Sequence, residues 1–193
     1  MSVSFDVYVR NQSAITSVAA RLADTTQEKH MAVIHGTNSD DHLSGTPERD
    51  FIQGLGGNDW IAGGAGADNL EGNQGDDTIF GNAGDDFLYG DQGNDALYGG
   101  EGNDNFVFTS GNGKDYVMDF TLGDKLYIED GINHTGIHTL ADLADRAEAA
   151  GTDTTVVDLG EGNSITLSNV NAADLQHHPE NYFSIMHSTD LFT

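Results

Sequence analysis

The sequence predicts an all-β fold: a parallel β-roll with two nonapeptide units per coil, followed by a β-rich C-terminal cap containing one or two short helices. The main observation is a nine-residue unit that repeats eight times without a gap from Gly36 to Val107. Glycine supplies 25 of the 193 residues and proline only 2, which is typical of a chain with many tight turns. Cysteine is absent, so neither disulfides nor thiolate-bound metals can hold this fold together.

Three positions of the repeat unit keep their residue type in all eight units. The first position is glycine: Gly36, Gly45, Gly54, Gly63, Gly72, Gly81, Gly90 and Gly99. The sixth position is aspartate: Asp41, Asp50, Asp59, Asp68, Asp77, Asp86, Asp95 and Asp104. The eighth position is large and apolar: Leu43, Ile52, Ile61, Leu70, Ile79, Leu88, Leu97 and Phe106. Columns without exception do not arise from composition alone, so the repeat must determine the fold of this region.

Each unit reads as a six-residue turn followed by three extended residues, and two units complete a flattened coil of eighteen residues. The apolar eighth residue points inward, because side chains alternate along a strand and the two facing strands share a thin core. Residues seven and nine point outward, which places Trp60, Phe80, Tyr89 and Tyr98 on the outside of the roll. These aromatic residues either pack partly against flanking segments or form a surface for a sugar or protein partner.

The sixth-position aspartates fall on the two edges of the roll, because turns two units apart stack on the same edge. One edge carries Asp41, Asp59, Asp77 and Asp95, and the other carries Asp50, Asp68, Asp86 and Asp104. Neighbouring strands lie ~4.8 Å apart, so carboxylates stacked at this spacing repel one another. The chain has 32 acidic and only 7 basic residues, a formal net charge of -25, so salt bridges cannot neutralise them. A hard dication between successive turns would remove the repulsion.

Calcium suits this arrangement better than other metals. It accepts roughly six to eight oxygen ligands in a loose geometry, whereas magnesium requires a strict octahedron. The repeats contain no cysteine and no histidine column, which argues against zinc and copper. The acidic composition also excludes nucleic acids and anionic membrane surfaces as natural partners, because both require a basic protein surface. The sequence has no apolar run long enough to span a membrane.

The units resemble the calcium-binding nonapeptide repeats, GGxGxDxUx, of RTX proteins, whose fold is a parallel β-roll. The best matches are Gly63–Glu71 and Gly99–Val107, and the following segments Gly113–Phe120 and Gly123–Leu126 are similar to the module that follows the roll in serralysins. The resemblance implies an extracellular protein that leaves the cell unfolded through a type I secretion exporter, with the secretion signal in its C-terminal region. It also implies folding outside the cell, where calcium is abundant.

The resemblance implies that the sixth-position aspartates and the turn carbonyls bind calcium. The residues carrying these carbonyls are Gly54, Gly56, Asn58, Gly63, Ala65, Ala67, Gly72, Gln74, Asp76, Gly81, Ala83, Asp85, Gly90, Gln92 and Asn94. The first two units depart from the pattern, with Ser39 in place of glycine and with Pro47, Glu48 and Arg49 in the second turn. We therefore expect incomplete sites at that end. Stacking of eight units gives three gaps per edge, so about six calcium ions is the expected ceiling.

The flanks, residues 1–35 and 108–193, differ from the repeat region 36–107. Before the repeats, Ser4–Val9 predicts a short strand and Ala14–Ala23 a helix, which together form either a cap or the remainder of an upstream domain. After the repeats the period of nine is expected to end. The predicted elements of the C-terminal cap are a turn and strand at 120–128, a helix from the N-cap Thr139 to Gly151, a hairpin of 155–159 and 164–167, a short helix at 172–176, and a strand around 182–185.

No motif in the sequence predicts catalysis. There is no HExxH zinc signature and no GxSxG elbow. His134, His138, His177 and His178 fall in predicted loops and are interpreted as surface residues, with a zinc site as the alternative for the first two. The leading hypothesis is a secreted calcium-binding protein that is disordered without calcium and folds when it binds the metal. The alternatives are an export and folding module of a secreted protease, lipase or polysaccharide epimerase, and a cell-surface adhesion module.

Overall fold

The computed structural model describes residues 5–8 and 31–187. The predicted strand near the N-terminus is confirmed as β1 (Phe5–Tyr8), which pairs in parallel with β2 (Ala32–His35). The helix expected at Ala14–Ala23 lies outside the described residues. Within the described part of the chain, no helix has the length and apolar character needed to cross a membrane.

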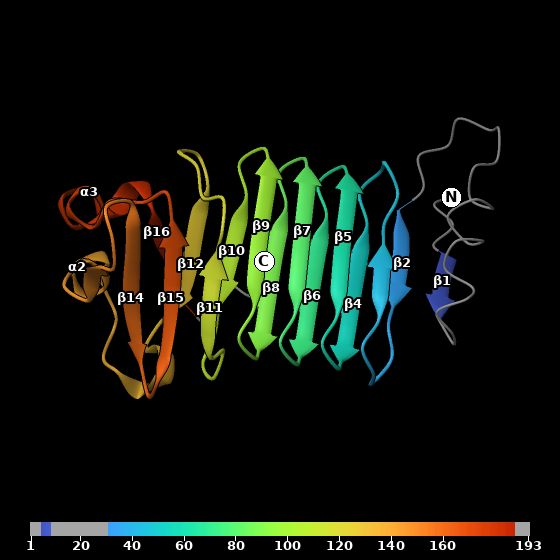
Figure 1. Cartoon of the computed structure of the whole chain (residues 1–193), viewed down its shortest axis with the longest axis horizontal. Coiled ribbons are helices and arrows are strands. Elements are labelled where there is room, and N and C mark those ends of the chain that lie inside the picture. Colours follow the sequence, from blue (N-terminus) through green and yellow to red (C-terminus); the bar gives the residue numbers. More distant parts are fainter. Residues whose placement is uncertain (1–4, 9–30, 188–193) are drawn as a thin grey trace.

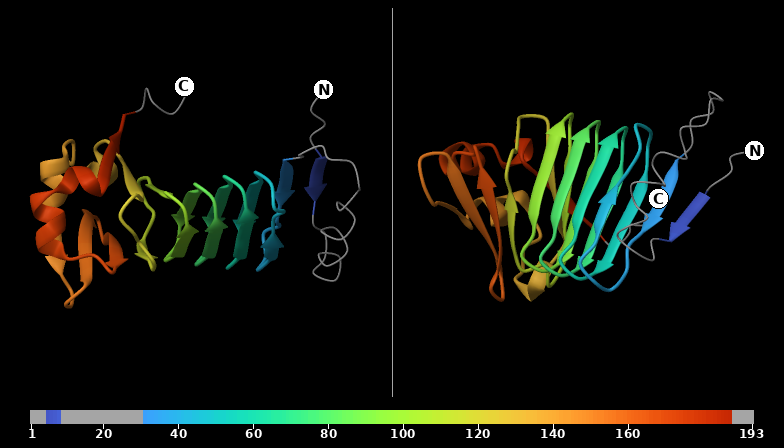
Figure 2. Two further views of the ribbon diagram at one scale, coloured as in Figure 1. Left: turned by 90° about the horizontal axis from the view of Figure 1, so that it is seen from above. Right: turned by 45° about the vertical axis from the view of Figure 1, so that its right-hand side comes forward.

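The chain winds into two facing sheets of eight strands each, and successive coils run along the long axis of the molecule (Figures 1 and 2). The first sheet contains, in spatial order, β1, β2, β4 (Phe51–Gly56), β6 (Asn69–Gln74), β8 (Phe87–Gln92), β10 (Asn105–Phe108), β12 (Lys125–Glu129) and β16 (Phe183–Met186). The second contains β13 (Ala147–Ala149), β14 (Thr154–Gly160), β15 (Asn163–Ser168), β11 (Lys114–Val117), β9 (Ala96–Glu101), β7 (Thr78–Ala83), β5 (Trp60–Ala65) and β3 (His42–Ser44). The predicted parallel roll with two units per coil is confirmed.

The eighth-position residues form the core, as the repeat predicts. Ile61 pairs with Ile79, and Ile79 pairs with Leu97, so equivalent side chains stack in rows along each sheet. All eight of these residues are at most 1 % exposed. The fold therefore rests on two rows of identical apolar contacts, one from each sheet, facing each other across a thin interior.

The strands in the middle of the roll are longer than the sequence predicts. They have six residues rather than three, because pairing between coils continues through the first three positions of the following unit. Leu55, for example, pairs with Asn73, and Gly56 pairs with Gln74. The turns proper are correspondingly short, and they bring the fourth to sixth positions to the edges of the sheets.

The coils continue beyond Val107, where the period of nine was expected to end. β10 pairs in parallel with β12, and β9 pairs in parallel with β11. Equivalent residues are now 20 positions apart instead of 18, as in the hydrogen bond from Asp95 to Asp115. Two inserted residues shift the register along the sequence, which conceals the repeat from a search with a fixed period of nine.

The C-terminal region closes the end of the roll opposite to the N-terminus (Figure 1). The hairpin of β14 and β15 is confirmed, and so are the strands β12 and β16. The helix α3 (Ala172–His177) is confirmed, and the single-turn helix η3 (Pro179–Asn181) follows it. Before them, another single turn, η2 (Ile132–His134), precedes the first helix.

The helix predicted from Thr139 to Gly151 is wrong in its length. Thr139 is the N-cap, and it forms a capping box with Asp142, but the helix α2 covers only Leu140–Ala144. The following residues form β13, which pairs antiparallel with β14. An apolar residue at 147 fits either a helical stripe or an edge strand, and the partner strand that decides between them is distant in sequence.

The outward aromatic residues of the second sheet pack on one another across neighbouring strands. His42 stacks on Trp60 with ring centroids 3.9 Å apart, and Phe80 stacks on Tyr98 at 4.6 Å. Trp60 and Phe80 are 5.4 Å apart in a tilted arrangement, which joins the two pairs into one row. Ring faces that contact each other are not presented to a ligand, so stacking of a sugar on these faces is disfavoured.

Candidate metal-binding turns

The sixth-position aspartates form two buried ladders, one along each edge of the roll. In each ladder the backbone N–H of one aspartate donates to Oδ1 of the aspartate one coil further on. The distance is 2.7 Å from Asp59 to Asp77 and 2.8 Å from Asp68 to Asp86. All eight aspartates of the repeats are at most 8 % exposed. The two predicted edges are thereby confirmed, and one oxygen of each carboxylate is committed to the stacking of coils.

Both ladders continue into the region after the repeats, which the sequence analysis missed. Asp95 donates to Asp115 Oδ1 at 3.0 Å, and Asp104 donates to Asp124 Oδ1 at 2.9 Å. A signal for the first of these exists in the sequence. Residues 110–118 read SGNGKDYVM, which has a glycine at its fourth position and an aspartate at its sixth once two inserted residues are allowed.

The second carboxylate oxygen, Oδ2, has no hydrogen-bond partner in seven aspartates of the described chain, although it is buried. These residues are Asp59, Asp68, Asp77, Asp86, Asp95, Asp104 and Asp115. A buried acceptor without a donor costs roughly 1–3 kcal/mol, and more when it is charged. Seven such atoms in regular array indicate that these turns are built for a cation.

The three carboxylates at the ends of the ladders differ from the others. Asp41 Oδ2 accepts from the backbone N–H of Thr37 at 2.6 Å and from its hydroxyl at 2.8 Å. Asp50 Oδ2 accepts the same two hydrogen bonds from Thr46, at 2.5 and 2.9 Å. Asp124 Oδ2 accepts from the N–H and hydroxyl of Thr121, at 2.7 and 3.2 Å. We call these three turns threonine-capped, and they are a feature that the sequence analysis did not foresee.

The second position of the unit separates the two kinds of turn within the repeats. The threonine-capped turns have Thr37 and Thr46 at this position. In the next turns Leu55, Asn73 and Asp91 stand there with a positive φ of 77°, 76° and 66°. Threonine is β-branched and avoids positive φ, so it keeps the turn in the form in which its own N–H and hydroxyl reach the carboxylate.

The first-position glycines leave room for oxygen atoms to converge. A Cβ placed on Gly72 would clash with Asp77 Oδ2 and would lie 2.8 Å from the carbonyl oxygen of Gly90. The same clash recurs at Gly81, with Asp86 Oδ2 and the carbonyl oxygen of Gly99 at 2.5 Å. A free carboxylate oxygen and a carbonyl oxygen of the next coil therefore approach one point, and this donor set fits calcium.

The other predicted carbonyl residues lie in the same turns with different roles. The first-position residues Gly54, Gly63, Gly72, Gly81 and Gly90 point a carbonyl oxygen at the glycine one coil back. The third-position residues Gly56, Ala65, Gln74, Ala83 and Gln92 end strands β4 to β8. The carbonyls of Ala83 and Gln92 already accept a backbone N–H at 2.8 Å. The fifth-position residues Asn58, Ala67, Asp76, Asp85 and Asn94 lie in the turns.

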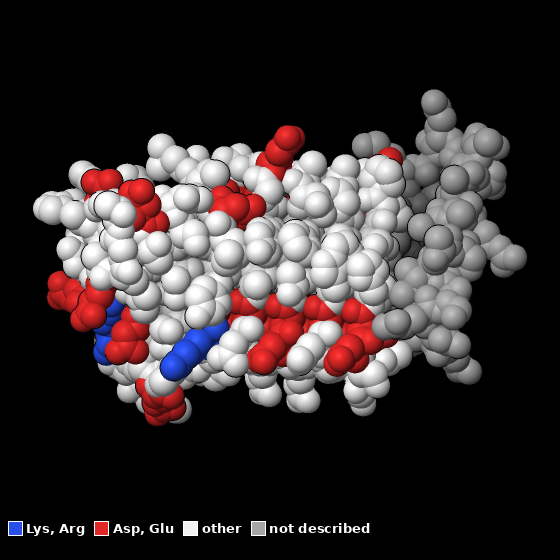
Figure 3. Space-filling view, in the orientation of Figure 1, with Lys and Arg blue, Asp and Glu red and all other residues white. Residues whose placement is uncertain are grey.

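Fifth-position side chains form a second, exposed ladder beside the first. Asn58 donates its backbone N–H to Asp40 Oδ1 at 2.8 Å, Asp76 donates to Asn58 Oδ1 at 2.9 Å, and Asn94 donates to Asp76 Oδ1 at 2.8 Å. These hydrogen bonds run toward the preceding coil, opposite to those of the buried aspartates. A band of acidic side chains follows one edge of the repeat region in Figure 3.

Burial disfavours the charged form of the ladder carboxylates, and nearby carboxylates add to the effect in most of them. The pKa rises from 3.8 to about 6 for Asp59 and Asp86, to about 7 for Asp68, Asp77, Asp104 and Asp115, and to about 8 for Asp95. Carboxylic acids that hold their protons near neutral pH are poorly matched to a metal-free fold. A bound cation would restore the charged form.

No cluster of three or more His, Cys, Asp or Glu side chains suited to a metal ion occurs in the described parts of the chain. A cation in these turns would therefore need backbone carbonyl oxygens beside the carboxylates. This requirement suits calcium, which takes carbonyl ligands readily, and does not suit zinc or copper, which prefer nitrogen and sulfur.

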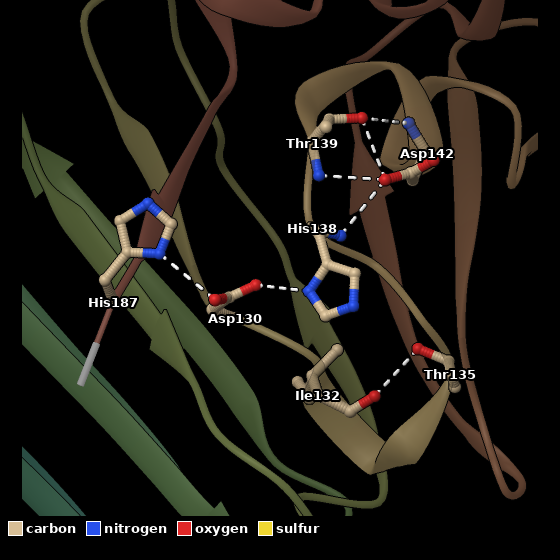
Figure 4. A network of polar contacts seen from close by, with 7 residues as sticks. All are labelled: Asp130, Ile132, Thr135, His138, Thr139, Asp142 and His187. Carbon is tan, nitrogen blue, oxygen red and sulfur yellow. Dashed lines mark hydrogen bonds and ion pairs between the residues drawn. The ribbon is translucent and has the colours of Figure 1, made fainter.

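The histidines lie away from the ladders. Asp130 bridges two of them, with His138 Nδ1 at 2.5 Å and His187 Nδ1 at 3.1 Å (Figure 4). These hydrogen bonds, with that from His138 first, lower the pKa of Asp130. His177 contacts the carbonyl oxygen of Ala173 through Nδ1, and His178 pairs with Glu180. His134 and His138 do not converge on a common partner in any contact between the described residues.

Comparison with known proteins agrees with the geometry of the turns. Residues 35–70 and 71–106 each match the family model "RTX calcium-binding nonapeptide repeat (4 copies)". A search of curated proteins found no match. Among solved structures, the extracellular lipase LipA from Serratia marcescens is similar at 19 % identity with a TM-score of 0.40. The alignment covers 86 % of this chain and 41 % of the lipase chain, so this chain spans less than half of that protein.

Proposed function

Because residues 35–106 are RTX calcium-binding nonapeptide repeats, the chain is a calcium-binding RTX module, and we propose that calcium drives its folding outside the cell. The observation that carries this proposal is the set of seven buried Oδ2 atoms without a donor. They occur in a chain with a formal net charge of -25. A fold that buries so many acceptors is incomplete without cations.

The residues that would bind calcium are the aspartates with a free Oδ2 and the first-position glycines of the next coil. Asp77 with the carbonyl of Gly90 is one such pair, and Asp86 with the carbonyl of Gly99 is another. Bound calcium supplies positive charge that stabilises the ionised carboxylates between two turns. Since the turns exist only when coils stack, metal binding favours the folded state by mass action, and its free energy becomes folding free energy.

Circular dichroism with and without calcium tests this coupling. At neutral pH and low salt, the chelated protein is expected to give a disordered spectrum, and calcium is expected to produce a strand spectrum cooperatively. Magnesium at the same concentration serves as the control and should not replace calcium, because of its stricter geometry. A strand spectrum that is unchanged by chelation at neutral pH would contradict the proposal.

Export by a type I secretion system is part of the same proposal. A chain that stays unfolded at low calcium inside the cell can pass an exporter and fold on reaching extracellular calcium, for which modules of this kind bind with a Kd of about 10⁻⁴–10⁻³ M. Co-expression with a type I exporter, with and without residues 108–193, tests this route. The full chain is expected in the medium and the truncated chain in the cell, whereas equal retention of both would refute the route.

The repeats themselves are non-catalytic, so the chain acts through binding in this proposal. The alternative of a module within a larger secreted enzyme predicts the same calcium behaviour and adds a catalytic domain on the same polypeptide. Determining the length of the protein made by its native host distinguishes the two. A product much longer than 193 residues would favour the enzyme.

A further inference from the structure

The turn formed by residues 110–115 stacks on the turn formed by residues 90–95 in the manner of two repeats. Gly93 donates its N–H to the carbonyl oxygen of Asn112 at 2.9 Å, and Asp95 donates to Asp115 Oδ1 at 3.0 Å. The glycine at 113 closely approaches the carbonyl oxygen of Gly93, just as Gly93 approaches that of Gly75. This turn lies outside the segments 35–70 and 71–106 that match the repeat family.

Asp115 has the feature that marks the metal-binding aspartates of the repeats. It is 1 % exposed, and its Oδ2 is buried without a partner among the described residues. The aspartate one coil before it, Asp95, is fully buried and also has a free Oδ2. The gap between these two turns therefore has the same pair of orphaned oxygens as the gap between Asp77 and Asp95.

The opposite edge ends differently. Asp124 continues the ladder after Asp104, but both of its oxygens accept hydrogen bonds, Oδ1 from Asp104 and Oδ2 from Thr121. Asp119 stands where the repeat has its first-position glycine, and its two oxygens accept from Gly99 and Gly100 at 2.9 and 3.1 Å. No free carboxylate oxygen is left at this turn in the described structure.

We propose that the calcium array extends one site beyond the repeats on one edge only, between Asp95 and Asp115, and that threonine-capped turns bound it elsewhere. The inference rests on the proposed function and adds a site and a limit to it. Gaps in which both aspartates have a free Oδ2 number three on the first edge (59–77, 77–95 and 95–115) and two on the second (68–86 and 86–104). The array thus holds five ions, one of them outside the repeats.

The number of bound calcium ions tests the inference directly. Native mass spectrometry of the wild-type chain, titrated with calcium chloride, is expected to reach five ions. Asp115→Asn keeps an oxygen for the N–H of Asp95 but removes the charge, and it is expected to reach four. Asp124→Asn is the matched control on the other edge, and it is expected to keep five ions.

Three results would overturn the inference while leaving the proposed function intact: five ions in Asp115→Asn, four ions in the wild-type chain, or a lost ion in Asp124→Asn. A wild-type chain that binds no calcium would instead refute the proposed function. If Asp115→Asn does not fold at saturating calcium, anomalous diffraction from calcium-loaded wild-type crystals decides. A peak between residues 90–95 and 110–115 supports the site, and peaks confined to the repeats exclude it.

Discussion

The partner of the second carboxylate oxygen separates two kinds of aspartate in this roll. In Asp41, Asp50 and Asp124 a threonine donates two hydrogen bonds to it, and the turn is complete by itself. In the aspartates between these ends, the same atom has no donor among the described residues. The first kind contributes to stability in the ordinary way, and the second does so only with a cation.

Asp77 takes part in two gaps between free carboxylates, so its charge is expected to matter twice. Asp77→Asn should raise the apparent Kd for calcium about tenfold or more, which corresponds to about 1.4 kcal/mol, and should lower the number of bound ions by up to two. Isothermal titration calorimetry measures both quantities. Asp153→Asn, at an exposed position away from the ladders, is the control, and an equal loss in both variants would argue against a specific site.

Thr46 is expected to stabilise the fold without taking part in calcium binding. Thr46→Val removes the hydroxyl that donates to Asp50 at 2.9 Å, and it should lower the free energy of unfolding by about 1 kcal/mol at saturating calcium. The number of bound ions should not change. Urea unfolding of this variant, compared with Thr78→Val on the outer face of β7, measures the effect, and a change in ion number would contradict this role.

At the scale of elements, the repeat predicted the coil and the core but not the ends of the roll. The period of nine placed Asp59 and Asp77 on one edge correctly because stacked coils require equal lengths. Asp115 was missed because two inserted residues break the sequence period while the coils still stack. The helix after Thr139 was predicted too long because β13 depends on a partner strand that no local pattern reveals. The free Oδ2 atoms themselves are visible only in three dimensions.

The first-position glycines are expected to tolerate no side chain. Gly72→Ala would place a methyl group against Asp77 Oδ2 and the carbonyl oxygen of Gly90, so it should destabilise the calcium-bound fold by about 1–3 kcal/mol through overpacking. It should also weaken calcium binding. Gly151→Ala, whose Cβ would meet Thr154 at an ordinary 3.7 Å, is the control. Similar thermal unfolding temperatures for the two variants would contradict the close packing at Gly72.

At the scale of the whole molecule, calcium and protons compete for the same carboxylates. The buried aspartates hold protons up to a pKa of about 6 for Asp59 and about 8 for Asp95, whereas an unfolded aspartate releases its proton near 4. Between these values the metal-free folded state binds more protons than the unfolded state. Its free energy of unfolding therefore falls as pH rises through this window.

Acidification is accordingly expected to weaken calcium binding and to reduce the need for calcium. The apparent Kd should be larger at pH 5.5 than at pH 7.5, and binding should release protons, as calorimetry in buffers of different ionisation enthalpy measures. Metal-free protein should show more strand signal by circular dichroism at pH 4.5 than at pH 7.5. A calcium affinity that does not change between these pH values would show that the carboxylates are already ionised in the metal-free state.

Equivalent atoms in the repeat region recur every 18 residues, so the roll resembles a ruler whose length can be reset in whole steps. Deleting residues 60–77 would join Asp59 to Thr78 and leave every inter-coil contact with an equivalent one. The shortened chain is expected to fold in calcium with two fewer ions, whereas deletion of nine residues should fail because it exchanges the two sheets. Gain or loss of whole coils would thus change the reach of the molecule without redesign of its ends.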